Sequence, residues 1–277
     1  MLVFCLICIV TCVAIVVSLR VRGIVYLGRT AAGWTCVHND TRTMGELVRV
    51  LEVEGTYQSA TYLDERWADP VFYYHRLFDH LFDSWPDGDS PRTIAVLGGG
   101  GYAIPKHLVA HHPEVERIDV IEIDGAIEHI ARKHFFLDRL EERYGAERAG
   151  RLCLHVDDAR DWLERCNRRF DVIVNDCFFG LEPDESLMGA DAAELIVKRL
   201  SPKGRYLTNV VAALEGPNAS VLYSTIEALS SVFAHVWVYP CGADNPNAIE
   251  NNVVIASNVW HAFEGAWEWP TAAKELT

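Results

Sequence analysis

The stretch AVLGGGGYAIPKH, residues 95–107, places four consecutive glycines between an apolar run and a helix-like segment. Glycine loses more conformational entropy on folding than any other residue, so four in a row are expected only where the backbone turns sharply or approaches a ligand closely. These glycines are Gly98, Gly99, Gly100 and Gly101. They follow the first strand of a predicted sheet, and in doubly wound folds this turn lies at the edge that binds nucleotides. We therefore expect them to line a ligand site.

Downstream of the glycines, apolar runs alternate with helical patterns, which predicts a mostly parallel sheet with helices on both faces. The expected strands are 93–98, 117–123, 151–156, 170–175, 204–211, 235–240 and 251–257. Helices are expected over 104–112, 125–135, 158–166, 190–200 and 218–233. The predicted class is therefore α/β, with one Rossmann-like domain over residues 69–277.

A small β domain is expected upstream, over residues 23–68. The segments ELVRVLEVEG (46–55) and TYQSATYL (56–63) alternate apolar with polar residues and meet at Gly55, which predicts a β-hairpin. The next segment, 69–85, has apolar residues at helical spacing and predicts a helix.

The first residues form a different kind of segment. Residues 2–19 are uncharged and mostly apolar, and Arg20 and Arg22 follow at once. Such a run is just long enough to cross a bilayer core of about 30 Å, and the flanking positive charge favours a cytoplasmic body. We predict a transmembrane anchor over residues 1–22 and a membrane-anchored protein; a cleaved signal peptide and a buried core helix are the alternatives.

The composition is that of a globular protein and argues against some partners. The formal net charge is −14 and no basic stripe offsets it, so nucleic acid is not an expected partner. The eight cysteines show no CxxC or CxxH spacing, which argues against a zinc site or a disulfide framework and favours a reducing compartment. His107, His111 and His112 have the residue type of metal ligands, but we expect a solvated helix face there and predict no metal.

Acidic residues stand at the ends of successive predicted strands. Glu122 closes the second strand, where a carboxylate can accept hydrogen bonds from ribose hydroxyls; a solvated strand end is the alternative. Asp157 and Asp158 follow the third strand, where they can meet an adenine amino group or cap the next helix. Asp176 follows the fourth strand and is a candidate general base. Together with the glycines, these residues predict a nucleoside-type site.

The segments VLGGGGYAIPKHL, VERIDVIEID, RLCLHVDDARDWL and FDVIVNDCFFG resemble the polyamine aminopropyltransferases, the spermidine synthase family. Upstream, LEVEGTYQSATYLD and YYHRLFDHLF resemble that family's N-terminal hairpin and its tyrosine-glutamine helix. The resemblance spans residues 50 to about 257. It implies a small N-terminal β domain followed by a seven-stranded, Rossmann-like sheet of the AdoMet-methyltransferase type.

The resemblance also implies roles for individual residues. It places Glu122 on the ribose, Asp158 (beside Asp157) on adenine, and Asp176 as the base. The remaining expected ligand contacts are Gln58 and the glycine turn for the nucleoside, and Tyr74, His75 and His80 for the second substrate. The co-substrate would be decarboxylated AdoMet or AdoMet, and the acceptor a small-molecule amine; no metal is required, and a homodimer is one expected assembly.

The sequence departs from the family pattern on the amine side. Gly101 stands where the family has an aspartate, and His75 where it has the helix glutamine. Pro70-Val71 replaces an acidic pair, and Asp176-Cys177-Phe178-Phe179-Gly180 lacks the second carboxylate of the base motif. We therefore predict an aminopropyltransferase-like enzyme. An AdoMet-dependent methyltransferase with an unknown acceptor and a non-catalytic nucleoside-binding module are the alternatives, and a dinucleotide dehydrogenase is disfavoured.

Overall fold

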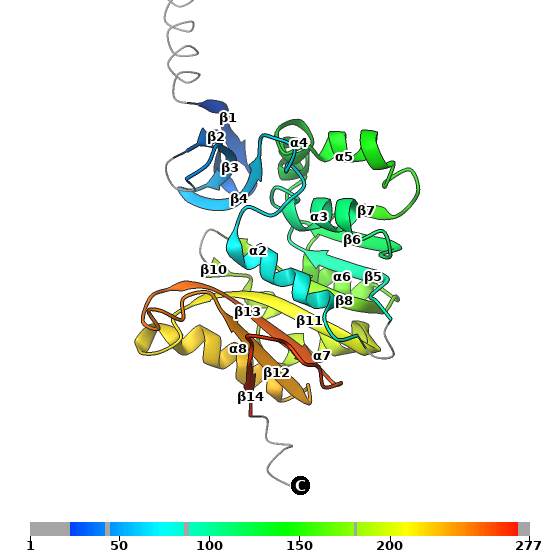
Figure 1. Ribbon diagram of the computed structural model, residues 1–277, viewed down its shortest axis with the longest axis vertical. Coiled ribbons are helices and arrows are strands. Elements are labelled where there is room, and N and C mark those ends of the chain that lie inside the picture. The colour runs from blue at the N-terminus through cyan, green and yellow to red at the C-terminus, as the bar shows by residue number, and fades with distance from the viewer. Residues whose placement is uncertain (1–22, 42–44, 86–88, 180–181, 271–277) are drawn as a thin grey trace, which may run out of the picture.

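The computed structural model describes residues 23–41, 45–85, 89–179 and 182–270, which form two main β-sheets and a two-stranded ribbon, with helices around the larger sheet (Figure 1). The predicted anchor, residues 1–22, lies outside this part of the chain. Within the described residues, no helix combines the length and apolar character needed to span a bilayer.

The N-terminal sheet is antiparallel, with its strands in chain order. They are β1 (Ile24–Thr30), β2 (Gly33–Asp40), β3 (Val48–Val53) and β4 (Thr56–Tyr62). The predicted hairpin is confirmed as β3 and β4, which turn through Glu54 and Gly55, both at positive φ. The sequence predicted a hairpin, and β1 and β2 extend it to four strands.

The segment expected as one helix over 69–85 is shorter and is divided. It forms α2 (Tyr73–Leu77) and then the 3-10 helix η1 (Phe78–Phe82). Its apolar side chains still face inward, because Phe78 and Leu81 are buried in the core beside the larger sheet. Tyr74 and His75, on α2, are also buried.

The larger sheet is mixed, in the order β14-β12-β13-β11-β8-β5-β6-β7. Its strands are β5 (Thr93–Leu97), β6 (Arg117–Glu122), β7 (Leu152–Val156), β8 (Phe170–Asn175), β11 (Leu200–Ala212), β12 (His235–Pro240), β13 (Glu250–Ser257) and β14 (Trp267–Trp269). All seven predicted strands are present, and β14 is an eighth. Strands β7, β6, β5, β8 and β11 run parallel, whereas β13 is antiparallel to both β11 and β12. A separate two-stranded ribbon is formed by β9 (Phe178–Phe179) and β10 (Glu182–Pro183).

Helices cover both faces of the larger sheet, as predicted (Figure 1). They are α3 (Ala103–His111), α4 (Gly125–His134), α5 (Leu137–Tyr144), α6 (Ala159–Arg165), α7 (Gly189–Arg199) and α8 (Ser220–Ser230), with 3-10 turns η3 (Glu185–Leu187) and η4 (Pro217–Ala219). Alternate residues of β5 enter two cores: Ile94 and Val96 on one face, Ala95 and Leu97 on the other. The helix α5 was not predicted.

The two sheets contact one another beside α4. The backbone N–H of Ala32 donates to Oδ2 of Asp124 at 3.0 Å, and Nη1 of Arg49 donates to the carbonyl of His134 at 3.2 Å. These contacts hold the N-terminal sheet over the carboxyl edge of the parallel strands. The region between that edge and the N-terminal sheet is where the predicted site residues meet.

Candidate functional site

The glycine turn lies between β5 and α3, and its conformation explains two of its glycines. Gly98 has φ +89°, and a Cβ there would lie 2.5 Å from the carbonyl oxygen of Asp176. Gly100 has φ +48°, and a Cβ there would make ordinary contacts, 3.8 Å from the carbonyl oxygen of Gln58 and 3.8 Å from Cβ of Ser59. Backbone strands therefore approach at Gly98 too closely for any side chain, which is why the turn needs glycine there.

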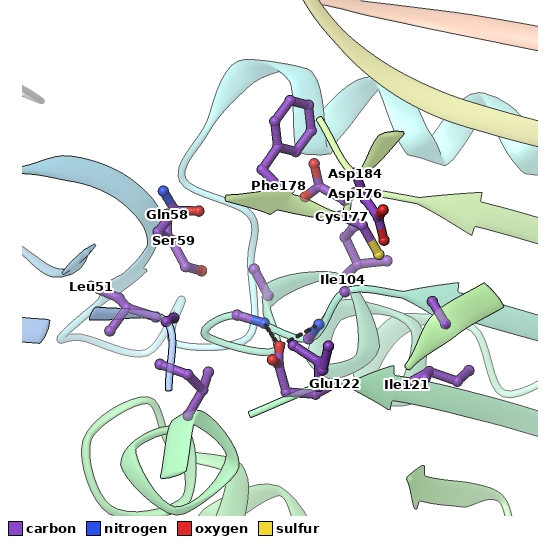
Figure 2. Close-up of a pocket in the computed structure, with 18 of the residues that line it drawn as sticks. Leu51, Gln58, Ser59, Ile104, Ile121, Glu122, Asp176, Cys177, Phe178 and Asp184 are labelled. Carbon is purple, nitrogen blue, oxygen red and sulfur yellow. Dashed lines mark hydrogen bonds between the residues drawn. The ribbon is translucent and has the colours of Figure 1, made fainter. Parts of the chain in front are cut away.

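Glu122, at the end of β6, holds this turn in place. Its Oε2 accepts the backbone N–H groups of Gly99 and Gly100, each at 3.0 Å, and its Oε1 accepts that of Asp124 at 3.0 Å. Figure 2 shows the first two of these bonds as dashed lines. Burial raises the pKa of Glu122, and the three N–H donors act against that rise.

Gly101 is placed differently from its three neighbours. It is buried and is absent from the pocket wall, which includes Gly98, Gly99 and Gly100. A Cβ at Gly101 would lie 2.5 Å from Oγ of Ser59 and 3.0 Å from Cδ1 of Phe135. A side chain at position 101 would therefore displace Ser59 before it reached a ligand.

Asp157 and Asp158 follow β7, and both line the pocket. Asp158 accepts the backbone N–H of Asp161 at 2.9 Å, which confirms the alternative of a helix cap on α6. Asp157 pairs with Arg165 through Oδ2. Neither role removes these carboxylates from the pocket wall, so their predicted contact with adenine stays a prediction.

Asp176 lies at the end of β8 and accepts three hydrogen bonds. Its Oδ2 accepts from the Tyr74 hydroxyl at 3.2 Å and from Nε2 of His75 at 3.1 Å. Its Oδ1 accepts from Nδ2 of Asn209 at 3.0 Å. The two donors on α2 and the donor on β11 fix the orientation of this carboxylate. Burial and the nearby Asp176 charge raise the pKa of the Tyr74 hydroxyl well above its usual value, so Tyr74 is a donor here.

The carboxylates just described and three of the four glycines line one pocket with a cavity volume of about 100 Å³. Figure 2 shows Gln58 and Ser59 of the N-terminal sheet on one side, with Asp176, Cys177 and Asp184 across from them and Glu122 below. Five carboxylates line the pocket, namely those of Glu122, Asp157, Asp158, Asp176 and Asp184, and none of its described wall residues is Lys or Arg. The pocket therefore has a strongly negative potential and suits a cationic ligand.

The pocket lacks an activated thiol, and one residue expected to contact the second substrate lies outside it. Burial raises the pKa of the Cys177 thiol well above its usual value, so this cysteine in the pocket wall is not an activated nucleophile. His80, expected to contact the second substrate, does not line the pocket. Its Nδ1 lies 2.6 Å from Oδ2 of Asp83, and its ring stacks on Tyr239 with centroids 4.2 Å apart.

Sequence reasoning missed Asn209, Asp184 and Ser59. Asn209 interrupts an apolar strand, β11, and this polar residue at a buried position was the available signal. Asp184 follows a segment without a strong pattern, and its Oδ1 accepts the backbone N–H of Ser186 at 2.9 Å. Ser59 is next to Gln58 in β4. Nothing in the sequence of that strand distinguishes this serine as a site residue.

Comparisons with known proteins find relatives over most of the chain. A model of the spermine/spermidine synthase domain matches residues 71–243. A polyamine aminopropyltransferase of Pectobacterium atrosepticum is 28% identical over 161 residues, which are 58% of this chain and 51% of that protein. Polyamine aminopropyltransferase 2 of Hyperthermus butylicus is 28% identical over 214 residues, which are 76% of this chain and 65% of that protein. The chain thus spans between half and two thirds of these curated relatives.

One solved structure shows the same fold over nearly the whole chain. The crystal structure of a probable spermidine synthase from Corynebacterium glutamicum superposes with a TM-score of 0.72, at 19% identity, over 90% of this chain and 91% of that one. The arrangement of a small antiparallel sheet over a mixed Rossmann-like sheet is therefore the fold of that protein as well.

Proposed function

The chain belongs to the spermine/spermidine synthase family, and from this premise we propose that it is a transferase acting on a sulfonium nucleoside. It binds decarboxylated AdoMet or AdoMet in the pocket between the two sheets. From decarboxylated AdoMet it transfers the aminopropyl group to a small-molecule amine, with Asp176 as the general base.

The charge of the pocket is the observation that carries this proposal. Its wall holds five carboxylates and no described Lys or Arg. A sulfonium carries a fixed positive charge, and an aliphatic amine is protonated at neutral pH, so both would gain from this potential when they lose water. A phosphate-bearing dinucleotide would be repelled, which disfavours a dehydrogenase.

The nucleoside half of the proposal rests on Glu122 and the glycine turn. An ionised carboxylate offers about four lone-pair positions, and Glu122 uses three of them on backbone N–H groups. We therefore expect it to accept from one ribose hydroxyl without rearrangement. Gln58, in β4, and Asp158, after β7, lie on the wall around it and complete the predicted contacts.

The chemistry is a displacement at the carbon beside the sulfonium. The amine nitrogen attacks that carbon, the carbon–sulfur bond breaks, and its electron pair neutralises the sulfur as methylthioadenosine leaves. The proton released by the amine passes to Asp176. Holding the two reactants in line contributes most of the acceleration, because effective molarities for well-oriented reactants can reach about 10⁵ M or more.

The residues expected to bind the amine acceptor match the family pattern less fully than those expected to bind the nucleoside. The second carboxylate of the family motif is absent, and the position of the helix glutamine is His75, which donates to Asp176. Asn209 donates to the same carboxylate from β11. Because a diamine would find fewer acidic partners here, we expect either an acceptor with less positive charge than a long polyamine or weaker binding of the acceptor.

The test is calorimetry of the full chain with AdoMet, decarboxylated AdoMet and methylthioadenosine, followed by mass spectrometry of reactions with linear diamines. Formation of methylthioadenosine and an aminopropylated amine is the expected result. Turnover of AdoMet to S-adenosylhomocysteine would favour the methyltransferase instead. Binding without any turnover over a broad acceptor panel would favour a non-catalytic nucleoside-binding module.

A further inference from the structure

Three histidines and two aspartates gather around α3 and η1, apart from the pocket just described. His107 and His111 lie on α3, His112 ends it, Asp79 lies on η1, and Asp69 precedes α2. The sequence led us to expect a solvated helix face here. That expectation holds for His111, whose side chain is 47% exposed, but His107 and His112 are only 14% and 19% exposed.

His107 is the centre of this histidine cluster and has an unusual environment. Its Nε2 lies 2.9 Å from Oδ1 of Asp79, yet the two atoms are not aligned for a hydrogen bond. Neither ring nitrogen of His107 has a hydrogen-bond partner among the described residues. A buried polar atom normally has a partner, so this one points to a missing ligand. In the tautomer that carries its proton on Nδ1, the Nε2 lone pair of His107 lies next to this carboxylate oxygen, and a cation bound to both atoms would satisfy both.

His112 is oriented as a metal-binding histidine is. Its Nδ1 lies 3.0 Å from Oε1 of Glu114, so that nitrogen carries the proton and the Nε2 lone pair is left for another partner. Its ring is stacked on Phe82, with centroids 3.7 Å apart and planes 3° from parallel. A carboxylate that fixes the tautomer of a histidine is the usual outer partner of a histidine bound to zinc. Nε2 of His112 then lies 3.9 Å from Oδ1 of Asp79.

We propose that Asp79, His107 and His112 bind a divalent transition-metal ion of the zinc type. The ligand atoms of these three residues lie within 4.8 Å of one another. Tetrahedral zinc with bonds of about 2.0–2.1 Å holds its ligand atoms roughly 3.3 Å apart. The two separations from Asp79, 2.9 and 3.9 Å, lie on either side of that value. Two imidazoles and a carboxylate, with water in the fourth position, are suitable ligands for zinc, cobalt or nickel.

His111 and Asp69 lie beside this set but are already paired. Nε2 of His111 lies 2.7 Å from Oδ1 of Asp69 with hydrogen-bond geometry. Although both could join His107 around an ion, that arrangement would break an existing bond. Among the described cations, Arg151 approaches this end of α3, and it does so through backbone carbonyls, including that of Val109 at 3.1 Å. The side chains of the cluster are thus left facing acidic partners.

The ion would connect two segments that reach the pocket. Asp79 is on η1, which continues from α2 and therefore from Tyr74 and His75. His107 is on α3, which begins directly after the glycine turn. Metal binding would fix Tyr74 and His75, which donate hydrogen bonds to Asp176, relative to the glycine turn. The site is independent of the proposed transfer reaction and can be tested without it.

The experiment measures metal binding by the full chain after chelator treatment. Zinc is titrated by calorimetry, and cobalt by its visible absorption, which also reports whether a cysteine thiolate is bound. We expect one ion per chain, a dissociation constant in the micromolar range or tighter, and no thiolate-to-cobalt charge-transfer band. A hundredfold excess of zinc over its dissociation constant should raise the melting temperature by roughly 5–10 °C.

Matched variants locate the ligands. H107Q and D79N should each weaken zinc at least tenfold, E114Q about tenfold, and H111Q less than threefold. H129Q, which removes an exposed histidine on α4, should change nothing. Circular dichroism in the presence of chelator checks that each variant is folded. If H107Q is not folded, zinc binding by D79N and the cobalt spectrum of the wild type decide whether the assignment of the ligands holds. Absence of zinc binding at 100-fold molar excess, binding untouched by D79N, a thiolate band, or a loss caused by H111Q alone would each overturn the assignment.

Discussion

Nε2 of His75 lies 3.1 Å from Oδ2 of Asp176, a contact between two residues that are 101 positions apart in the chain. Both side chains are shielded from solvent, with 4% and 13% of their surfaces exposed. The contact joins α2 to the carboxyl end of β8. The candidate base of the second half of the chain is therefore oriented by a helix that precedes the Rossmann-like sheet.

Asp176→Asn should reduce the transfer rate by roughly 10²–10⁴, the usual contribution of a general base. The amide keeps the size of the side chain but accepts no proton, so affinity for methylthioadenosine should change less than threefold. Single-turnover rates and calorimetry measure the two effects. Asp184→Asn is the matched control, because it removes another carboxylate from the same pocket wall. Full activity of Asp176→Asn would exclude this residue as the base.

Glu122→Ala should weaken nucleoside binding by about 1.5–3 kcal/mol, the range of a hydrogen bond to a charged group. The substitution also frees the N–H groups of Gly99 and Gly100, which Glu122 now accepts. Calorimetry with methylthioadenosine gives the affinity. Glu122→Gln separates the two effects, because its amide oxygen can still accept from the turn. Unchanged affinity in a folded Glu122→Ala variant would contradict the ribose assignment.

Gly98→Ala should destabilise the fold by roughly 2–5 kcal/mol. The new Cβ would lie 2.5 Å from the carbonyl oxygen of Asp176, on a backbone with φ +89°. Gly55→Ala is the control: φ is +81°, but no atom lies within 4 Å of its Cβ position. It should cost only about 1–2 kcal/mol of backbone strain. Urea unfolding measures both, and equal losses would show that the close approach at Gly98 relaxes freely.

Lys106 should make stability rise with pH above neutrality. It is fully buried, and burial lowers its pKa to about 7 from 10.5, although its Nζ donates to Oγ1 of Thr61 and to two backbone carbonyls. Between pH 7 and 10.5 the unfolded chain therefore binds a proton that the folded chain lacks. The free energy of unfolding then increases with pH, by at most about 1.4 kcal/mol per unit.

Lys106→Met should lack this increase, and the exposed Lys133→Met should keep it. The measurement is urea unfolding between pH 7.5 and 9.5, read as the difference between each variant and the wild type. That difference cancels the titration of buried thiols, which changes stability in the same pH range in all three proteins. Parallel pH profiles for wild type and Lys106→Met would show that the ammonium stays charged inside the fold.

Residues 2–19 should retain the full chain in a membrane, because an uncharged segment of this length can span a bilayer core of about 30 Å. Fractionation after alkaline carbonate extraction measures retention, and protease protection in sealed vesicles reports the side of the body. We expect the body on the cytoplasmic side. A mature chain that starts after Leu19 would favour a signal peptide, and an uncleaved chain in the soluble fraction would exclude the anchor.

Most of the larger sheet could be predicted because each strand carries its own signal. Apolar runs bounded by glycine, proline or acidic residues gave all seven predicted strands, and the glycine row identified the first. The strand β14, Trp267–Trp269, is too short to show alternation. The helix α5 is rich in charge and presents few apolar residues, Leu137 and Leu140 among them, so its sequence carries only a weak helical signal.

Part of the site could also be predicted, because its residues directly follow the predicted strands. Residues directly after parallel strands must meet at one edge, so Glu122, Asp157, Asp158 and Asp176 could be grouped from sequence order. Asn209 could not, since it lies inside a strand, whereas its partner Asp176 directly follows a neighbouring strand. Gly101 shows the opposite case: the three glycines before it line the pocket, whereas a Cβ on Gly101 would point at Ser59.

The sequence by itself determined the α/β class, the glycine turn and the acidic strand ends, because these depend on local patterns and on strand direction. Only the tertiary structure decided which side chains touch: the donors Tyr74, His75 and Asn209 on Asp176, and the cluster of His107 and His112 with Asp79. Those contacts join residues that are distant in the chain, on elements that meet only in the folded protein. Their distances are set by how helices pack on the sheet, and packing leaves no signal in a single stretch of sequence.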